Sequence, residues 1–205
     1  MMFASSTIIE EIKTTQESED ASLAMYYYDF REDKKKDLRG LLTSVLFQLC
    51  DQSDSYHPVL STFYSTYHNG ARTPSEDELI RCLIDLFKLP ESRQVYLIVD
   101  GLDECPSTSS LSSPREELLS LLEDLVGEKL PNLRICVTSR PEVDIKTILE
   151  PLAFRSVSLQ DAPGQQKDIR DYIESVVRAN IKMKNWSPRL KQHVTDVLTR
   201  KADGM

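Results

Sequence analysis

Two hydrophobic patterns alternate along the chain. Short runs of apolar, β-branched and aromatic residues predict β-strands, and they lie at Ala24 to Phe30, Gln94 to Asp100, Leu133 to Thr138 and Arg155 to Leu159. The run that ends Leu97-Ile98-Val99 has no polar residue in alternation. This is typical of a central strand that is covered on both faces.

Between these runs, apolar residues repeat at helical spacing and predict helices. One such face carries Leu38, Leu41, Leu42, Val45, Leu46 and Leu49, and a second carries Leu79, Leu83, Leu86 and Phe87. Ser75 followed by Glu78 predicts a capping box at the start of the second helix. Ser113, Pro114 and Glu116 predict the start of a third, and Gly127 suits its end.

Two more helical patterns follow the last predicted strand, and the second of them starts at Ser187-Pro188. Strands that are separated by helices require crossover connections, so the strands run parallel. We therefore predict an α/β fold, a parallel sheet with helices on both faces, followed by a helical C-terminal portion.

Composition narrows the class of protein without naming it. Of 205 residues, 40% are hydrophobic and 28% are charged, which excludes collagen-like and low-complexity chains and disfavours disorder. The formal net charge of -8 disfavours binding along a nucleic-acid backbone. The basic run at 34–36 lies between Asp33 and Asp37 and is interpreted as a solvated loop, so no nucleic-acid partner is expected.

Targeting signals and cysteines point to an intracellular protein. The apolar start, 1–9, has no basic leader, and no stretch reaches the roughly 18 apolar residues of a membrane span. We expect a cytoplasmic location and no membrane partner. Cys50, Cys82, Cys105 and Cys136 form no C-x-x-C pair and are interpreted as buried reduced thiols rather than zinc ligands.

The strongest chemical signal follows the central predicted strand. Asp100 ends that strand, and Asp103 and Glu104 follow within four residues. Ligands of open α/β sheets bind at the carboxyl ends of strands, where an aspartate can hold Mg²⁺ through water and a second acid can polarise a water. A plain strand with a polar turn has the same pattern, and that alternative stays open.

The next strand ends in Thr138-Ser139-Arg140-Pro141. An arginine at this place can reach a γ-phosphate and stabilise charge in the transition state. An exposed arginine in a turn is the alternative. The two signals are more specific together, because they fall at matching ends of consecutive strands.

The two motifs, DGLDEC at 100–105 and TSRP at 138–141, resemble the NACHT branch of the STAND P-loop NTPases. More closely, the chain is similar to the NACHT-type NTPase domain of fungal NOD-like receptors, the nephrocystin-3-like N-terminal domain. FASSTIIEEI at 3–12 resembles the helix after the phosphate loop, 24–49 resembles the second strand and its helix, and KADGM at 201–205 resembles the lead into the helical and winged-helix parts. The resemblance covers nearly the whole chain.

This resemblance implies a P-loop NTPase core of the ASCE/STAND type and specific residue roles. Asp100 would be the Walker B acid on Mg²⁺, through water. Asp103 and Glu104 would polarise the attacking water, with Glu104 as the first choice of base, and Arg140 would be the sensor at the γ-phosphate. Residues 1–160 would be a partial NACHT core and 161–205 the start of the helical extension. Mg-ATP would be the cofactor, and other domains of a larger receptor, effector and repeat domains, would be the partners.

The chain departs from the family at the phosphate loop. None of its six glycines begins a G-x-x-x-x-G-K-[ST] motif, and no Gly-Lys-Ser or Gly-Lys-Thr occurs. By the resemblance, Met1 falls where that loop would have ended, so the family's first strand would be missing and the chain would be an internal slice of a larger switch. We therefore expect weak or no ATP binding and no hydrolysis by this chain alone.

The missing strand also predicts a particular sheet. The family order, by resemblance, places it between the strand at 133–138 and the strand at 155–159. We expect the first three predicted strands to be contiguous, and 155–159 to be displaced across a gap or collapsed onto 133–138. An open edge of this kind favours self-association.

Three interpretations of function follow. The first is a nucleotide-binding switch or its remnant, and the second is a non-catalytic interaction or oligomerisation module that keeps the fold without nucleotide. The third is a helicase, since Asp103-Glu104 resembles a DExx box. Its strand would end at the acid pair, whereas here it ends at Asp100, and TSRP stands in place of the companion S-A-T.

Overall fold

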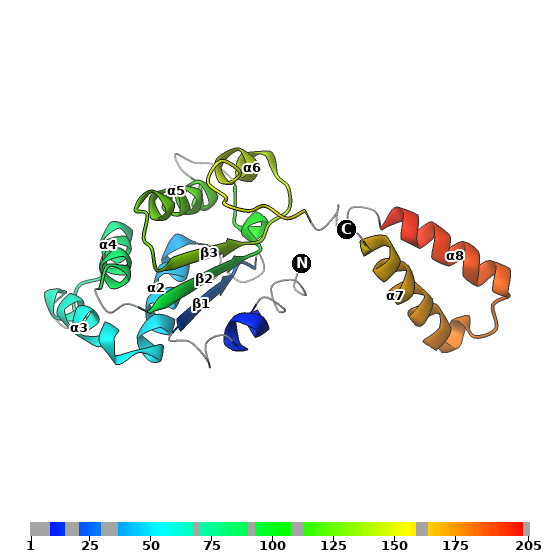
Figure 1. Ribbon diagram of the computed structural model, residues 1–205, viewed down its shortest axis with the longest axis horizontal. Helices are drawn as coiled ribbons and strands as arrows, with labels where there is room; N and C mark the ends of the chain where they lie inside the picture. The colour runs from blue at the N-terminus through cyan, green and yellow to red at the C-terminus, as the bar shows by residue number, and fades with distance from the viewer. Residues whose placement is uncertain are drawn as a thin grey trace. The chain divides into compact units, whose positions relative to one another are not determined.

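The computed structural model describes residues 9–14, 21–29, 37–67, 70–89, 93–107, 113–158 and 164–202. The chain divides into two compact units, Met1–Ala153 and Phe154–Met205. The first unit contains the sheet and the second is helical (Figure 1).

Three parallel strands form the sheet of the first unit: β1 (Ala21–Tyr27), β2 (Gln94–Asp100) and β3 (Leu133–Val137). Their order is β1-β2-β3, with Leu97 of β2 opposite Ala24 on one side and Ile135 on the other. The parallel α/β class and the contiguous order of the first three predicted strands are confirmed. β1 begins at Ala21, three residues earlier than the apolar run predicted.

The predicted strand at 155–159 is wrong for its described residues. Residues 155–158 belong to no strand, and position 159 lies outside the described residues. Val157, the apolar residue of this part, is 66% exposed. A strand needs the backbone of a neighbour, and among the described strands none lies along the outer edge of β3.

Helices and short turns connect the strands. The helices of the first unit include α2 (Leu38–Gln52), α3 (His57–Thr66), α4 (Glu76–Phe87), α5 (Pro114–Gly127) and α6 (Val143–Leu149), with 3₁₀ turns η2 (Asp54–Tyr56) and η3 (Leu102–Glu104). The predicted capping boxes of α4 and α5 are both present, with Ser75 and Ser113 as N-caps. Within the described part of the chain, no helix is long and apolar enough to cross a membrane.

Among the described residues, the two faces of the sheet are covered unequally. Val95, Leu97 and Val99 of β2 face a large core that α2, α4 and α5 complete with buried leucines. Ile98 faces the opposite side, where Ile9 of the helical residues 9–14 packs in a much smaller cluster. Alternation along the strands therefore places apolar side chains on both faces, as a covered parallel sheet requires.

Helix α2 also covers the outer edge of β1. The side-chain amide of Gln52 accepts a hydrogen bond from Leu23 N at 2.8 Å and donates to Leu23 O at 2.6 Å. Gln48, one turn earlier, does the same with Met25 N at 3.0 Å and Met25 O at 2.8 Å. Two glutamines thus satisfy four backbone groups that a neighbouring strand would otherwise bind.

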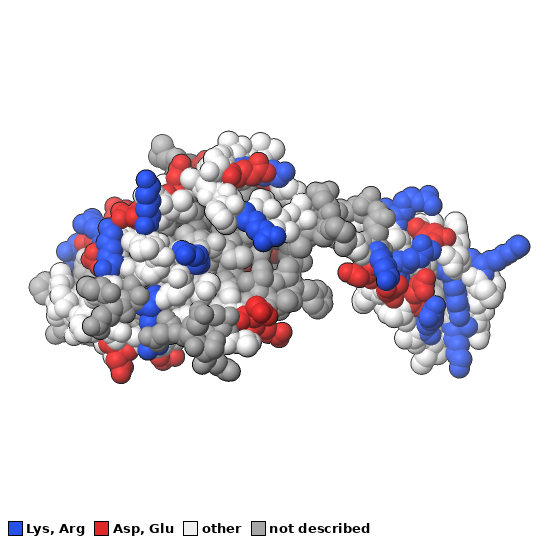
Figure 2. Space-filling model, viewed as in Figure 1, with Lys and Arg blue, Asp and Glu red and all other residues white. Residues whose placement is uncertain are grey.

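The second unit is a pair of helices, α7 (Gln165–Ala179) and α8 (Pro188–Lys201), joined through the 3₁₀ turn η4 (Ile181–Met183). Arg170 of α7 pairs with Glu174 at 3.5 Å and with Asp196 of α8. From Arg178 to Lys201 the sequence has seven Lys and Arg residues and one acid. Basic side chains accordingly predominate on this unit in Figure 2.

Candidate functional site

Asp100 lies at the carboxyl end of the central strand and is 6% exposed. Its Oδ1 accepts a hydrogen bond from the Thr138 hydroxyl. The Thr138 oxygen in turn accepts from Gly101 N at 3.1 Å. The carboxylate is therefore fixed by the residue that follows β3, and its orientation depends on both strands.

A left-handed turn follows Asp100. Gly101 has a φ of 72°, and a Cβ at this position would meet the Tyr28 carbonyl oxygen at 3.4 Å. Residues with a side chain are strained in this conformation. The turn starts η3, in which Glu104 N donates to Gly101 O at 2.8 Å. Glycine at 101 thus permits the reversal that brings the next two acids back to the end of the strand.

Asp103 and Arg140 meet across the two strand ends. The Asp103 carboxylate accepts from Arg140 N at 3.0 Å through Oδ1 and pairs with Arg140 Nε at 3.2 Å through Oδ2. The Asp103 side chain is 6% exposed, whereas that of Arg140 is 74% exposed. Both carboxylate oxygens of Asp103 are thus engaged by Arg140, and the arginine remains accessible to solvent.

Glu104 is half-buried and lies beside the turn. Its Cδ is 4.0 Å from the place where a Cβ of Gly101 would lie. No hydrogen bond joins its carboxylate to another described residue. Of the three acids, Glu104 is therefore the one whose carboxylate is not already held by a neighbouring side chain.

The structure also assigns Arg115 to this region, a residue that the sequence did not single out. Arg115 is 5% exposed and lies in the first turn of α5. It donates to Asp103 O at 2.6 Å and to Cys105 O at 3.0 Å, and pairs with Glu142 and with Asp144 at 3.2 Å. The only sequence signal is its helical spacing from the buried Leu118 and Leu119.

Electrostatics agree with this buried arrangement. Burial acts to lower the pKa of Arg115, but the hydrogen bonds to Glu142 and Asp144 outweigh it and raise the pKa above its ordinary value. Burial acts to raise the pKa of Asp144, but hydrogen bonds from Arg115 and backbone groups leave it lowered. Each partner therefore favours the charged form of the other.

The thiols offer no reactive group. None of the four cysteines is in a disulfide, and Cys50, Cys82 and Cys105 are buried while Cys136 is half-buried. Burial raises the pKa of Cys105 to about 12 and those of Cys50 and Cys82 to about 11. Thiols with such values are almost entirely protonated at neutral pH and are poor nucleophiles.

Of the acids at the carboxyl end of β2, Asp100 is the one that fits a magnesium–phosphate group. Among the described residues, no group of three or more His, Cys, Asp or Glu side chains could enclose a metal ion. Mg²⁺ is commonly held by one or two carboxylates together with substrate phosphates and water. Asp100 fits that use, since Oδ2 makes no hydrogen bond to a described residue while Oδ1 is fixed by Thr138.

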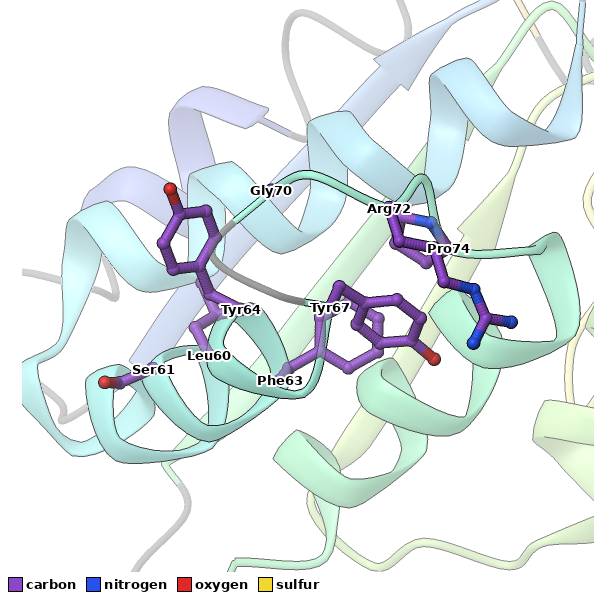
Figure 3. Close-up of a pocket in the computed structure, with 8 residues that line it drawn as sticks. All are labelled: Leu60, Ser61, Phe63, Tyr64, Tyr67, Gly70, Arg72 and Pro74. Carbon is purple, nitrogen blue, oxygen red and sulfur yellow. The ribbon is translucent and has the colours of Figure 1, made fainter.

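A separate hollow of about 440 Å³ lies beside α3, away from these acids. Its lining includes Leu60, Phe63, Tyr64, Tyr67 and Arg72, and Figure 3 shows the aromatic side chains around it. The rings of Phe63 and Tyr67 are 4.7 Å apart, and the Arg72 guanidinium lies 5.4 Å from the Tyr67 ring centre. No carboxylate and none of the candidate site residues is among the described residues that line it.

Comparison with known proteins gives one match. The family model described as Nephrocystin 3, N-terminal, matches residues 2–140, which include β1, β2, β3 and all four candidate site residues. No curated protein and no solved structure matches the chain.

Proposed function

The chain belongs to the nephrocystin 3 N-terminal family, and from this membership we propose that its first unit is the partial core of a NACHT-type STAND signalling switch. In this proposal the carboxyl ends of β2 and β3 form the magnesium and γ-phosphate side of a nucleotide site. Other domains of a larger receptor would be its partners.

The observation that carries the proposal is the convergence of Asp100, Asp103 and Arg140 at one edge of the sheet. These residues are separated by up to 40 positions in sequence, yet Asp103 and Arg140 form an ion pair of 3.2 Å and Asp100 is bound by Thr138. A buried carboxylate, an unengaged carboxylate at Glu104 and an exposed guanidinium at one strand edge suit phosphate chemistry.

Each side chain has a separate task in this site. Asp100 would hold Mg²⁺ through water at Oδ2, because Oδ1 is bound by Thr138. Glu104 accepts a proton from the attacking water, because its carboxylate is the available one. Asp103 holds Arg140 while no phosphate is bound. When nucleotide binds, the Arg140 guanidinium leaves Asp103 and faces the γ-phosphate. When bound, Mg²⁺ supplies charge neutralisation for the phosphate groups.

The donors that cradle β- and γ-phosphates are a glycine-rich loop and its lysine, and this sequence contains no such motif. Carboxylates without those donors repel a triphosphate. We therefore expect the 205-residue chain to bind Mg-ATP with a dissociation constant no tighter than about 1 mM. Isothermal titration calorimetry measures this directly, and micromolar affinity would contradict the proposal that the phosphate side is incomplete.

A second measurement tests the assigned roles. In a chain extended at its N-terminus by a strand and a G-x-x-x-x-G-K-[ST] loop, Asp100→Ala is expected to weaken Mg-ATP binding. Glu104→Gln is expected to spare binding and slow hydrolysis by about 10²–10⁴-fold. The exposed Glu123→Gln on α5 is the matched control and should change neither. Equal hydrolysis by the extended wild-type chain and its Glu104→Gln variant would exclude Glu104 as the base.

The second candidate function is a non-catalytic interaction module. The outer edge of β3, along which no described strand lies, favours it. The same titrations separate the two candidates. If the extended chain, tested with its phosphate loop in place, still fails to bind Mg-ATP, the interaction module is favoured.

A further inference from the structure

We propose that Arg115 is a positioning residue that couples the two loops of the candidate site. The first loop is 101–106, which carries Asp103 and Glu104, and the second loop is 138–144, which carries Arg140. The relevance of this coupling to nucleotide rests on the proposed function, but the coupling itself requires no nucleotide.

Arg115 holds the first loop entirely through main-chain atoms. Its guanidinium donates to the carbonyl oxygens of Asp103 at 2.6 Å and Cys105 at 3.0 Å. Its own amide donates to Pro106 O at 3.2 Å. Three of the six carbonyl groups of this loop are therefore bound by one residue, whose helix starts with a capping box at Ser113.

Arg115 holds the second loop through charge. The same guanidinium pairs with Glu142 and, at 3.2 Å, with Asp144. Glu142 N donates to Arg140 O at 2.8 Å, so the segment held by Arg115 is also the segment that supports Arg140. A buried guanidinium needs such partners, because leaving its donors unsatisfied is costly.

The two loops also contact each other directly, and Arg115 connects them through a separate set of contacts. Asp103 pairs with Arg140, and Leu102 N donates to Thr138 O at 3.0 Å. The proposed function requires Arg140 to exchange Asp103 for a phosphate group. The contacts of Arg115 do not include the Asp103 carboxylate or the Arg140 guanidinium, so they persist through that exchange. Arg115 thereby keeps both loops in place while the direct ion pair is broken.

Lysine cannot replace this arrangement. A guanidinium has five donors in a fixed planar fork, whereas an ammonium is a single point of charge on a flexible stem. In Arg115→Lys, the positive charge remains available to Glu142 and Asp144. The bonds to both carbonyl groups of the first loop cannot be kept at the same time, so that loop should loosen more than the second.

Amide hydrogen exchange of the 205-residue chain tests the coupling. The reporters are Leu102, Glu104 and Cys105 in the first loop and Arg140 and Glu142 in the second, whose amides are all hydrogen-bonded. We expect Glu142→Gln to raise exchange in the first loop on the order of tenfold, through the weakened hold on Arg115. No hydrogen bond or ion pair described for the Glu142 side chain reaches the first loop.

The double variant isolates the route of this effect. In an Arg115→Lys background, Glu142→Gln should add little further exchange in the first loop, since the connection is already lost. Arg170→Lys is the matched control, because Arg170 pairs with two acids in the second unit, and it should leave both loops unchanged. Leu122→Ala, a core variant of the same helix, reports the exchange pattern of general destabilisation.

Two results would overturn the coupling. One is that Glu142→Gln raises amide exchange in the second loop only. The other is that Arg115→Lys raises amide exchange uniformly, as Leu122→Ala does. Mg-ATP titration of the N-terminally extended chain is judged separately. If that chain binds no Mg-ATP, the proposed function fails, and the exchange experiment still decides the coupling.

Discussion

The two edges of the sheet are treated in opposite ways. At β1, the backbone groups that point away from β2 are bound by Gln48 and Gln52 of α2, in four hydrogen bonds of 2.6–3.0 Å. At β3, the backbone N–H and C=O groups of Leu133, Ile135 and Val137 point away from β2, because these residues alternate with those whose backbone groups bind β2. No described strand lies along this outer edge of β3. One edge is closed by side chains, and no strand among the described residues covers the other.

We infer from this difference that an open sheet can limit strand association to one of its edges. Exposed backbone groups at an edge are a template for another strand. Because the amides of Gln48 and Gln52 occupy the β1 edge, that edge is not available without displacing α2. The β3 edge is instead held at its carboxyl end, where Thr138 binds Asp100 and Gly101. The candidate site therefore lies at the end of the strand whose outer edge no described strand covers.

The largest effect is expected from removing the side-chain cover of β1. Gln48→Met with Gln52→Met keeps chain length and helix propensity. It removes the four hydrogen bonds to the β1 backbone, and also the bonds from Gln48 to Ser44 and from Gln52 to Gln48 O. At about 0.5–1.5 kcal/mol for each of the four bonds to β1, the free energy of unfolding should fall by about 2–6 kcal/mol. Urea denaturation measures this fall. Phe47→Met, on the exposed side of the same helix, should stay within about 0.5 kcal/mol of wild type.

If the double variant loses no more stability than Phe47→Met, water replaces the glutamines at no cost. The two edges would then be equivalent, and the comparison between them would fail.

A smaller effect is expected at β3, in association rather than stability. The wild-type chain should show a mass that rises with concentration, because the outer edge pairs with another copy. Ile135→Pro removes an outward N–H and should weaken this association on the order of tenfold. Ile135→Val keeps the N–H and is the matched control. Sedimentation velocity at several concentrations measures the association.

A strictly monomeric wild-type chain would contradict this expectation. So would a sharp, concentration-independent melting transition above about 65 °C, the upper end for ordinary mesophile domains.

The sequence predicted those features that depend on neighbours along the chain. The capping boxes at Ser75 and Ser113 involve residues three positions apart, and both formed. Asp103 and Arg140 could be placed together because adjacent parallel strands end at the same edge. At the end of α5, Gly127 stays within the helix, and Lys129 takes the positive φ, at 51°.

The features that the sequence could not predict depend on contacts across the fold. Gln48, Gln52 and Arg115 are polar residues in helices, and most such residues face solvent. Their contacts follow from which backbone groups lie opposite, at separations of 10 to 29 residues. The segment 155–158 failed as a strand for the same reason, because its pattern did not specify a neighbouring strand.

The smallest effect is expected from lowering the pH, and it should distinguish the β3 edge of the sheet from the β1 edge. The pKa of Asp144 in the folded chain is below its ordinary value of 3.8, since hydrogen bonds from Arg115 and backbone groups outweigh burial. A lowered folded pKa contributes stability above pH 3.8, and this contribution is lost as pH falls through the folded value. The amides of Gln48 and Gln52 do not titrate in this range.

Below pH 3.8, the protection of 138–144 should therefore fall before that of β1. Hydrogen exchange, corrected for its intrinsic pH dependence, measures the difference. Asp144→Asn should reduce this difference, and Asp124→Asn, a change at an exposed residue of α5, should leave it unchanged. Equal loss of protection at β1 and at 138–144 would show that acid unfolds the unit as a whole and that the β3 side has no separate electrostatic hold.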